Sequence, residues 1–389
     1  MTVTNEQKQL LQQTVYVLKD YGRAVMTGFY AALFKAHPEY RNFFNPTNQA
    51  TGKQPQAFAA TIAAFVDNLD SPDALVPQMS RLSSKHRAVG VRPDNYPVVG
   101  EYLVQAIVDA LDEKATPEVV AAWKALYDSM AQTFIAKEKE LYAQLGDNPA
   151  DQGFVPFTVV AKDVVASGPT YVVTLARQDG GQLWKYNPGQ YITVRVVVKG
   201  VANNGHYTLL EPYNGNTYKI ALKLGNKTDQ NTVTTEEIVN KYPVDSTVLV
   251  SAPAGSFSLG ANAGSYVFIS GGSGIASLLP LINQLNQQGQ ASKVTVIQSV
   301  KNEDYAAFAA QLHSMLPPGQ YVILTAENPI SKKNLQGKVQ ADTEVYVSGS
   351  EMFIELAQAA LVGANVNPSQ VHIKSIEPTL GLLKNIKKN

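Results

Sequence analysis

The stretch YVFISGGSGIASLLPLINQLNQQ, residues 266–288, runs from an apolar segment through a glycine-rich turn into an amphipathic segment. A short apolar run bounded by glycines is typical of a buried strand, whereas the three- and four-residue spacing after it favours a helix. Such a turn lets backbone N–H groups approach a phosphate at the start of the helix. The stretch therefore predicts the opening strand, turn and helix of an α/β fold.

The chain that follows keeps alternating between apolar runs and amphipathic segments. Strands are predicted at 293–300, 321–327, 344–350 and 371–376, and helices at 304–316 and 352–364. Strands that alternate with helices argue for a parallel sheet of the doubly wound type. We expect this α/β domain to span residues 264–389.

The chain that precedes this stretch has a different texture. Short β-branched stretches, separated by turn-forming residues, lie at 156–165, 171–178, 190–200, 218–225 and 246–255. This spacing suits an antiparallel sandwich or barrel. We expect this β domain to span residues 152–260.

The amino-terminal third is helical in pattern. Apolar residues recur at three- and four-residue spacing in 24–36, 57–69, 102–113 and 119–145. Prolines lie between these stretches, where helices can stop. The turn-rich segment LGDNPADQG, residues 145–153, ends the pattern. We predict an all-α domain over residues 1–147.

Composition excludes several classes of protein. The chain has 389 residues, of which 45% are hydrophobic and 16% charged, with 32 basic and 32 acidic residues. This balance offers no field that would attract nucleic acid. With no cysteine, disulfide scaffolds, iron–sulfur clusters and cysteine nucleophiles are excluded. The sequence contains neither a signal peptide nor a transmembrane segment, so we expect a cytoplasmic protein, a monomer or weak dimer.

His86 is the candidate metal ligand among the five histidines. It lies in KHRAVGVRPDNYPVVGEYL (85–103), at the end of a helical stretch. An all-α domain with aromatic-rich helices is a natural haem pocket, and one axial histidine commonly holds haem iron. Together with GFYAALFKAHPEYRNFFN (28–45), GKQPQAFAATI (52–62) and FIAKEKELY (134–142), this stretch resembles the globin domain of flavohaemoglobins. The two later domains resemble that family's FAD-binding β-barrel and NAD(P)-binding α/β domain.

The resemblance implies one iron ligand, His86, and two groups of residues around haem b. On the distal side, two polar side chains and two aromatic rings would line the pocket: Tyr30, Gln54, Phe44 and Phe58. Behind or beside the ligand would lie Lys85, Tyr96 and Glu138.

The chemistry of haem explains why such residues are needed. The hydroxyl of Tyr30 would stabilise the negative charge that develops on bound O2. Glu138, oriented by Tyr96, would accept the imidazole N–H and push electron density toward iron, which favours O–O chemistry over reversible carriage. Taken singly, Tyr30 could be a core tyrosine, Gln54 a helix cap and Glu138 a solvated carboxylate. Their joint occurrence at matching positions favours the haem interpretation.

The FAD signatures are present only in part. NPGQYITV (187–194) resembles the strand in which a tyrosine, here Tyr191, packs near the flavin. The family's Arg-x-Tyr-Ser signature here reads Gly205-His206-Tyr207-Thr208. Loss of the arginine that neutralises the FAD pyrophosphate costs ~1.5–3 kcal/mol, or roughly ten- to a hundredfold in affinity. His206 or Lys223 could compensate.

The nicotinamide signatures are altered as well. The residues expected at the NAD(P)H phosphates are Gly272, Ser273, Gly274, Ile275, Ala276 and Ser277, of which the last two replace threonine–proline. The family's Cys-Gly-Pro is Ser348-Gly349-Ser350. Its carboxy-terminal Glu-Cys-Phe-Gly-Pro is Lys374-Ser375-Ile376-Glu377-Pro378. We therefore expect the cofactor contacts at positions whose residues differ from those of the family, with Lys374 in place of an acidic residue.

Three functions are compatible with this sequence. The first is a nitric oxide dioxygenase that uses O2 and NO as ligands of haem b and takes electrons from NAD(P)H through FAD. The second is an O2- or NO-binding haemoglobin, a scavenger or sensor, whose reductase half has weak or lost cofactor binding. The third is a flavin reductase with an incidental haem domain, and the substituted flavin contacts argue against it.

Overall fold

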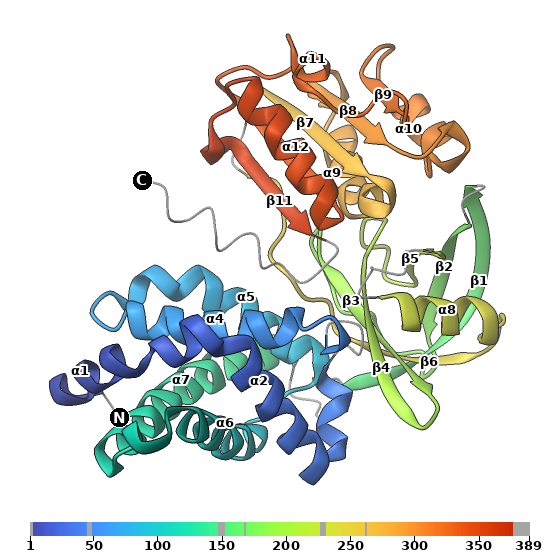
Figure 1. Cartoon of the computed structure of the whole chain (residues 1–389). Coiled ribbons are helices and arrows are strands. Elements are labelled where there is room, and N and C mark those ends of the chain that lie inside the picture. The colour runs from blue at the N-terminus through green and yellow to red at the C-terminus, as the bar shows by residue number, and fades with distance from the viewer. Residues whose placement is uncertain are drawn as a thin grey trace. The chain divides into compact units, whose positions relative to one another are not determined.

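The computed structural model describes residues 3–44, 49–146, 152–166, 169–225, 231–260 and 263–375. They form two compact units (Figure 1). The first holds the helices up to Phe154 together with Val197–Asn204, and the second holds Val155–Val196 and the described residues from Gly205 onward. The fold class, an all-α part followed by an antiparallel and then a parallel sheet, is confirmed. Because most of both sheets lies in the second unit, the boundaries of three separate domains stay a prediction.

The first unit consists of amphipathic helices around one core. Its helices are α1 (Asn5–Thr14), α2 (Tyr16–Ala36), α4 (Lys53–Asp67), α5 (Val76–Val89), α6 (Asn95–Leu111) and α7 (Pro117–Ala143), with 3-10 turns η1 (Pro38–Phe43), η2 (Pro72–Leu75) and η3 (Asp112–Lys114). Prolines open η1, η2 and α7, positions where a missing N–H costs nothing. The core includes Phe29, Ile107 and Trp123. No helix among the described residues has the length and apolar character that a membrane crossing requires.

The antiparallel sheet has the strand order β4-β3-β6-β1-β2-β5. Its strands are β1 (Phe154–Ala166), β2 (Thr170–Arg177), β3 (Tyr191–Val198), β4 (Val201–Thr208), β5 (Tyr218–Lys223) and β6 (Thr247–Ser251). A bridge between Leu209, just after β4, and Ile220 of β5 joins the two ends of this order. The strands therefore close into a barrel, which removes the open edges of the sheet.

The parallel sheet has the strand order β11-β10-β7-β8-β9. Its strands are β7 (Ser265–Gly271), β8 (Val294–Ser299), β9 (Tyr321–Leu324), β10 (Thr343–Gly349) and β11 (Val371–Ser375), and its helices are α9 (Ile275–Gln287), α10 (Ala309–Met315), α11 (Lys332–Leu335) and α12 (Glu351–Gly363). Short 3-10 turns η5 (Gly272–Gly274), η6 (Ala291–Lys293), η7 (Glu303–Tyr305) and η8 (Pro368–Gln370) connect them. The strand order reverses between β7 and β10, and ligands of such sheets bind at the carboxyl ends of the strands near that point.

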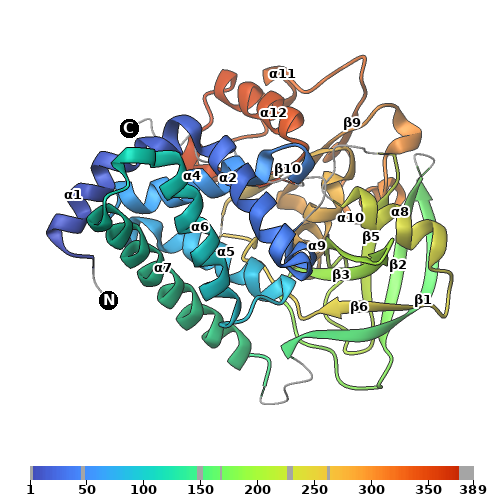
Figure 2. The ribbon, with the colours of Figure 1, turned by 60° about the horizontal axis from the view of Figure 1, so that its bottom comes forward.

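The sequence pattern did not predict strand β4 or helix α8 (Thr232–Lys241). Strand β4 begins VANNG, and the asparagines and glycine read as a turn although their backbone pairs in the barrel. Helix α8, which lies beside β5 (Figure 2), is rich in β-branched residues that favour strands. The predicted helix over 304–316 was too long, because it starts only after Phe308, whose φ is +65°.

Lys162 on β1 fixes the end of α8. Its Nζ donates to the carbonyl oxygens of Ile238, Val239 and Tyr242 at 3.0, 3.0 and 2.7 Å, which adds a charged donor to the carbonyl groups at the helix end. We expect Lys162→Met to lower the free energy of unfolding, measured by urea denaturation, by about 1–3 kcal/mol. The matched control is Lys219→Met on β5, which loses only a partly exposed ion pair with Glu211 and should cost about 1 kcal/mol or less. Equal losses in the two variants would contradict the capping role.

Candidate functional site

His86, Tyr96 and Glu138 form one hydrogen-bonded cluster, although they come from α5, α6 and α7. Glu138 Oε1 lies 2.8 Å from His86 Nδ1, and the Tyr96 hydroxyl donates to the same oxygen at 2.6 Å. The Tyr96 hydroxyl also lies 3.0 Å from Nδ1. Because an ionised carboxylate can only accept, Nδ1 carries the proton and Nε2 keeps its lone pair. The cluster therefore presents one neutral imidazole nitrogen that can bind a metal.

The backbone around this cluster is held by contacts that the sequence pattern did not reveal. Helix α5 ends at Gly90, whose φ of +87° lets the chain turn sharply after His86. The Tyr127 hydroxyl donates to the carbonyl oxygen of Tyr96 at 2.6 Å. A Cβ on Gly100 would lie 2.3 Å from the Tyr127 ring, so only glycine permits this approach. Tyr127 and Gly100 thus position Tyr96, and neither was singled out from the sequence.

The buried state of Tyr96 keeps its proton in place. Burial, followed by the adjacent Glu138 carboxylate, raises the pKa of Tyr96. Its phenol therefore remains a donor to Glu138 at neutral pH. Lys85, the neighbour of His86 in α5, is half-buried, and burial together with Arg81 lowers its pKa.

Tyr30 of α2 is buried among aromatic rings in the same unit. Its ring centroid lies 5.1 Å from that of Phe44 and 6.2 Å from that of Phe58. Burial raises the pKa of Tyr30, whereas hydrogen bonds with the side chains of Gln49 and Gln54 oppose the rise. The phenol is thus a protonated donor held by two amides. Gln54 and the two phenylalanines were predicted here, and Gln49 was missed because a glutamine before a helix has no distinctive pattern.

The residues present fit a haem group. Glu138 is 2% exposed, and among the described residues its Oε2 has no hydrogen-bond partner. A buried carboxylate is costly unless a positive charge compensates it. An iron bound at Nε2 of His86 would supply that charge through the imidazole. The aromatic cluster around Tyr30 would supply the apolar surroundings.

The motifs predicted to contact the nicotinamide cofactor lie at the carboxyl ends of the parallel strands. Gly272, Ser273 and Gly274 form η5 directly after β7, and Ile275, Ala276 and Ser277 open α9. Ser348 and Gly349 end β10, and Ser375 ends β11. A Cβ on Gly274 would lie 2.2 Å from the carbonyl oxygen of Ser348, so glycine is required where η5 meets β10. Ile376, Glu377 and Pro378 lie outside the described residues.

In β4, the glycine that replaces the family's arginine is covered by a neighbouring side chain. A Cβ on Gly205 would lie 2.6 Å from the Tyr207 hydroxyl, so the Tyr207 ring folds back over this glycine. Tyr207 is 4% exposed, and its hydroxyl lies 2.9 Å from Thr235 Oγ1 on α8. Gly205, at which the family signature has a cation, thus lies beneath the ring of Tyr207, the tyrosine of the same signature.

The two residues that could compensate for the arginine lie in different surroundings. His206 Nδ1 lies 3.0 Å from Thr193 Oγ1, and its ring contacts Tyr191 edge to face with centroids 5.3 Å apart. Asn231 exchanges hydrogen bonds with the His206 backbone at 2.8 Å in both directions. Lys223 Nζ lies 3.1 Å from the place a Cβ would take on Gly272, which puts its charge beside the glycine-rich turn.

Thr208 meets the carboxyl ends of the parallel strands. Its Oγ1 lies 3.4 Å from Ser277 Oγ and accepts a hydrogen bond from Lys374 Nζ at 2.9 Å. Lys374 also donates to the carbonyl oxygen of Gly189 at 2.9 Å. Three motifs that lie far apart in the sequence therefore converge at one place, which fits a cofactor ring bound between barrel and parallel sheet.

Comparisons with known proteins agree with this arrangement. Residues 27–134 match the family model described as Globin. A flavohemoprotein of Halalkalibacterium halodurans is 32% identical over an alignment of 400 residues that covers 97% of each chain. A flavohemoprotein of Deinococcus radiodurans is 35% identical over 309 residues, 79% of this chain and 75% of that one.

A solved structure shares the fold. The flavohemoglobin of Malassezia yamatoensis, solved with bound FAD and heme, matches with a TM-score of 0.85 at 24% identity, covering 96% of this chain and 99% of that one. The fold agrees along the described chain, and the sequence agrees with the bacterial relative over nearly the whole length of both chains. This chain therefore belongs to the flavohemoprotein family.

Proposed function

We propose that the protein is a nitric oxide dioxygenase that converts NO and O2 to nitrate with electrons from NAD(P)H, and that it acts in the cytoplasm. The observation that carries the proposal is the cluster of His86, Glu138 and Tyr96. When bound, haem supplies an iron at which O2 is held for reaction with NO. A carboxylate behind the imidazole increases electron donation to iron, which simple reversible oxygen carriage does not need.

The chain's own residues have separate tasks in this proposal. His86 would hold the iron, Glu138 fixes the imidazole tautomer, and Tyr96 orients the carboxylate. Tyr30, hydrogen-bonded with Gln49 and Gln54, would donate a hydrogen bond to O2 held at the iron. Phe44 and Phe58 exclude water, which strengthens these interactions.

The reductase half would supply the electrons. When bound, FAD converts the hydride of NAD(P)H into single electrons for the haem. Tyr191, Thr208 and Lys374 would surround the ring, and the turn at Gly272 with Lys223 would receive the NAD(P)H phosphates. Each NAD(P)H provides two electrons and so serves two molecules of NO.

A second function is favoured by the end of β4. Gly205 itself offers no charged side chain, and the Tyr207 hydroxyl lies in the space beside it, 2.9 Å from Thr235 Oγ1. If this change prevents FAD binding, the protein is an O2- or NO-binding haemoglobin with a reductase half that serves only as a scaffold.

The two functions are separated by the electron path. We expect acid-released flavin to approach one per haem, and NADH or NADPH to reduce the haem anaerobically without an added reductase. The control is the same chain after FAD removal, which should lose haem reduction and regain it when FAD is added. A flavin-to-haem ratio near zero in excess FAD would favour the binding haemoglobin.

A further inference from the structure

Lys374 places an ammonium group where the barrel and the parallel sheet meet. Its Nζ has two acceptors, the Gly189 carbonyl oxygen before β3 and Thr208 Oγ1 at the end of β4, each at 2.9 Å. The same Nζ lies 5.2 Å from the centre of the Phe257 ring. Ser348 holds the Lys374 backbone by donating to its carbonyl oxygen at 2.9 Å. Three segments therefore surround the ammonium group, and a fourth holds the backbone of Lys374.

Within the part of the chain that the structure describes, no carboxylate forms an ion pair with this ammonium. Among the described residues, both hydrogen-bond acceptors of Lys374 are uncharged oxygens. Burial of its ammonium group lowers the pKa of Lys374 to about 7. The side chain is half-buried, and a cation withdrawn from water without an anion is costly, so a site of this kind suits a negatively charged group.

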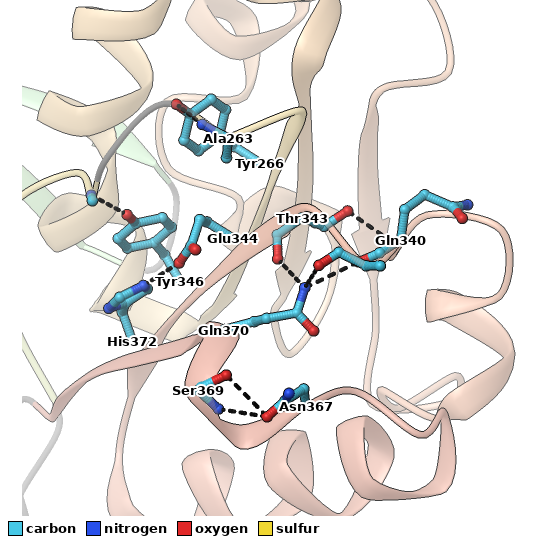
Figure 3. A network of polar contacts seen from close by, with 12 residues as sticks. Ala263, Tyr266, Gln340, Thr343, Glu344, Tyr346, Asn367, Ser369, Gln370 and His372 are labelled. Atoms are coloured by element: carbon cyan, nitrogen blue, oxygen red, sulfur yellow. Dashed lines mark hydrogen bonds and ion pairs between the residues drawn. The ribbon is translucent and has the colours of Figure 1, made fainter.

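The other titratable groups on this face of the sheet are engaged with one another. Figure 3 shows that Glu344 of β10 forms an ion pair with His372 of β11, and that the Tyr346 ring lies beside them. The Tyr346 hydroxyl accepts a hydrogen bond from the Gly260 N–H at 2.7 Å. The Glu344 carboxylate is thus used by His372, and the charge of Lys374 is available for a ligand.

We propose that Lys374 is the positive contact of the flavin ring and favours its reduced, negatively charged form. This inference rests on the proposed function, because it requires FAD in the reductase half. On hydride transfer, NAD(P)H loses two electrons and one proton and leaves as NAD(P)⁺. The flavin gains the same two electrons and proton and hence one negative charge, while Lys374 keeps its own proton. The attraction between the two charges holds reduced flavin more tightly than oxidised flavin.

The test compares the flavin midpoint potential of the full chain with that of variants at pH 6, where Lys374 is protonated. We expect Lys374→Met to lower the ratio of affinities for reduced and oxidised flavin about tenfold, which corresponds to ~30 mV for a two-electron couple. Lys374→Glu should lower it further. Lys293→Met, at an exposed lysine of the same unit, should leave it unchanged.

A conservative variant keeps the test decisive if Lys374→Met fails to fold. Lys374→Arg retains the charge at all accessible pH values, so its potential should match wild type at pH 6 and exceed it at pH 8.5. If the bound flavin has the same potential in the wild type and in the Met or Arg variants at both pH values, the inference about Lys374 is wrong and the proposed dioxygenase is unaffected. A wild-type chain that takes up no flavin would overturn both this inference and the proposed dioxygenase.

Discussion

The His86→Ala variant is expected to purify without the haem Soret band that the wild-type protein shows. The Nε2 nitrogen of His86 keeps the lone pair that can bind iron, because the other ring nitrogen, Nδ1, is hydrogen-bonded to Glu138 at 2.8 Å. Alanine removes the metal ligand and also leaves the Glu138 carboxylate buried without a cation. Both effects act against haem retention, so the expected loss is nearly complete. The absorbance ratio of the Soret band to protein measures it directly.

The matched control is His37→Ala in the same helical unit. His37 lies 3.3 Å from Glu39 in a contact whose two side chains are 36% and 61% exposed, so its removal should leave haem content unchanged. Added imidazole should restore a Soret band to His86→Ala, which shows that the pocket still folds. Wild-type haem content in His86→Ala without imidazole would rule out the axial assignment.

The proximal cluster shows how far sequence can lead. His86 and Tyr96 are 10 residues apart and Glu138 is 52 residues from His86, so spacing alone does not bring them together. The resemblance to flavohaemoglobins indicated all three residues, and the packing of their helices places them within hydrogen-bond distance. Tyr127 and Gly100 were beyond prediction, because a tyrosine on a helical stripe reads as core and the need for glycine depends on a ring from another helix.

In the reductase half, the substitutions in the sequence do not indicate which contacts the new residues make. The sequence indicates that an arginine became Gly205 and an acid became Lys374, and both changes read as losses. The structure shows that the Tyr207 ring lies over Gly205 and that Lys374 donates hydrogen bonds to Gly189 and Thr208. These contacts depend on residues more than 160 positions from Lys374, which no local pattern can connect. A substituted site can therefore be a rebuilt one.

Tyr30→Phe is expected to raise the rate of O2 dissociation roughly ten- to a hundredfold. The substitution keeps the ring that contacts Phe44 and Phe58 and removes only the hydroxyl. Because burial raises the pKa of Tyr30, the phenol is a donor at neutral pH. A hydrogen bond to a charged acceptor contributes ~1.5–3 kcal/mol, which sets the size of the effect. Stopped-flow displacement of O2 measures the rate.

The control for this variant is Tyr21→Phe on the same helix. Tyr21 is 62% exposed, so loss of its hydroxyl should leave O2 dissociation unchanged. Gln49→Leu and Gln54→Leu should each raise the rate less than Tyr30→Phe, because they free the phenol to rotate and leave it in place. If Tyr30→Phe releases O2 at the wild-type rate, the phenol does not face the bound gas, and stabilisation of its negative charge must come from another group.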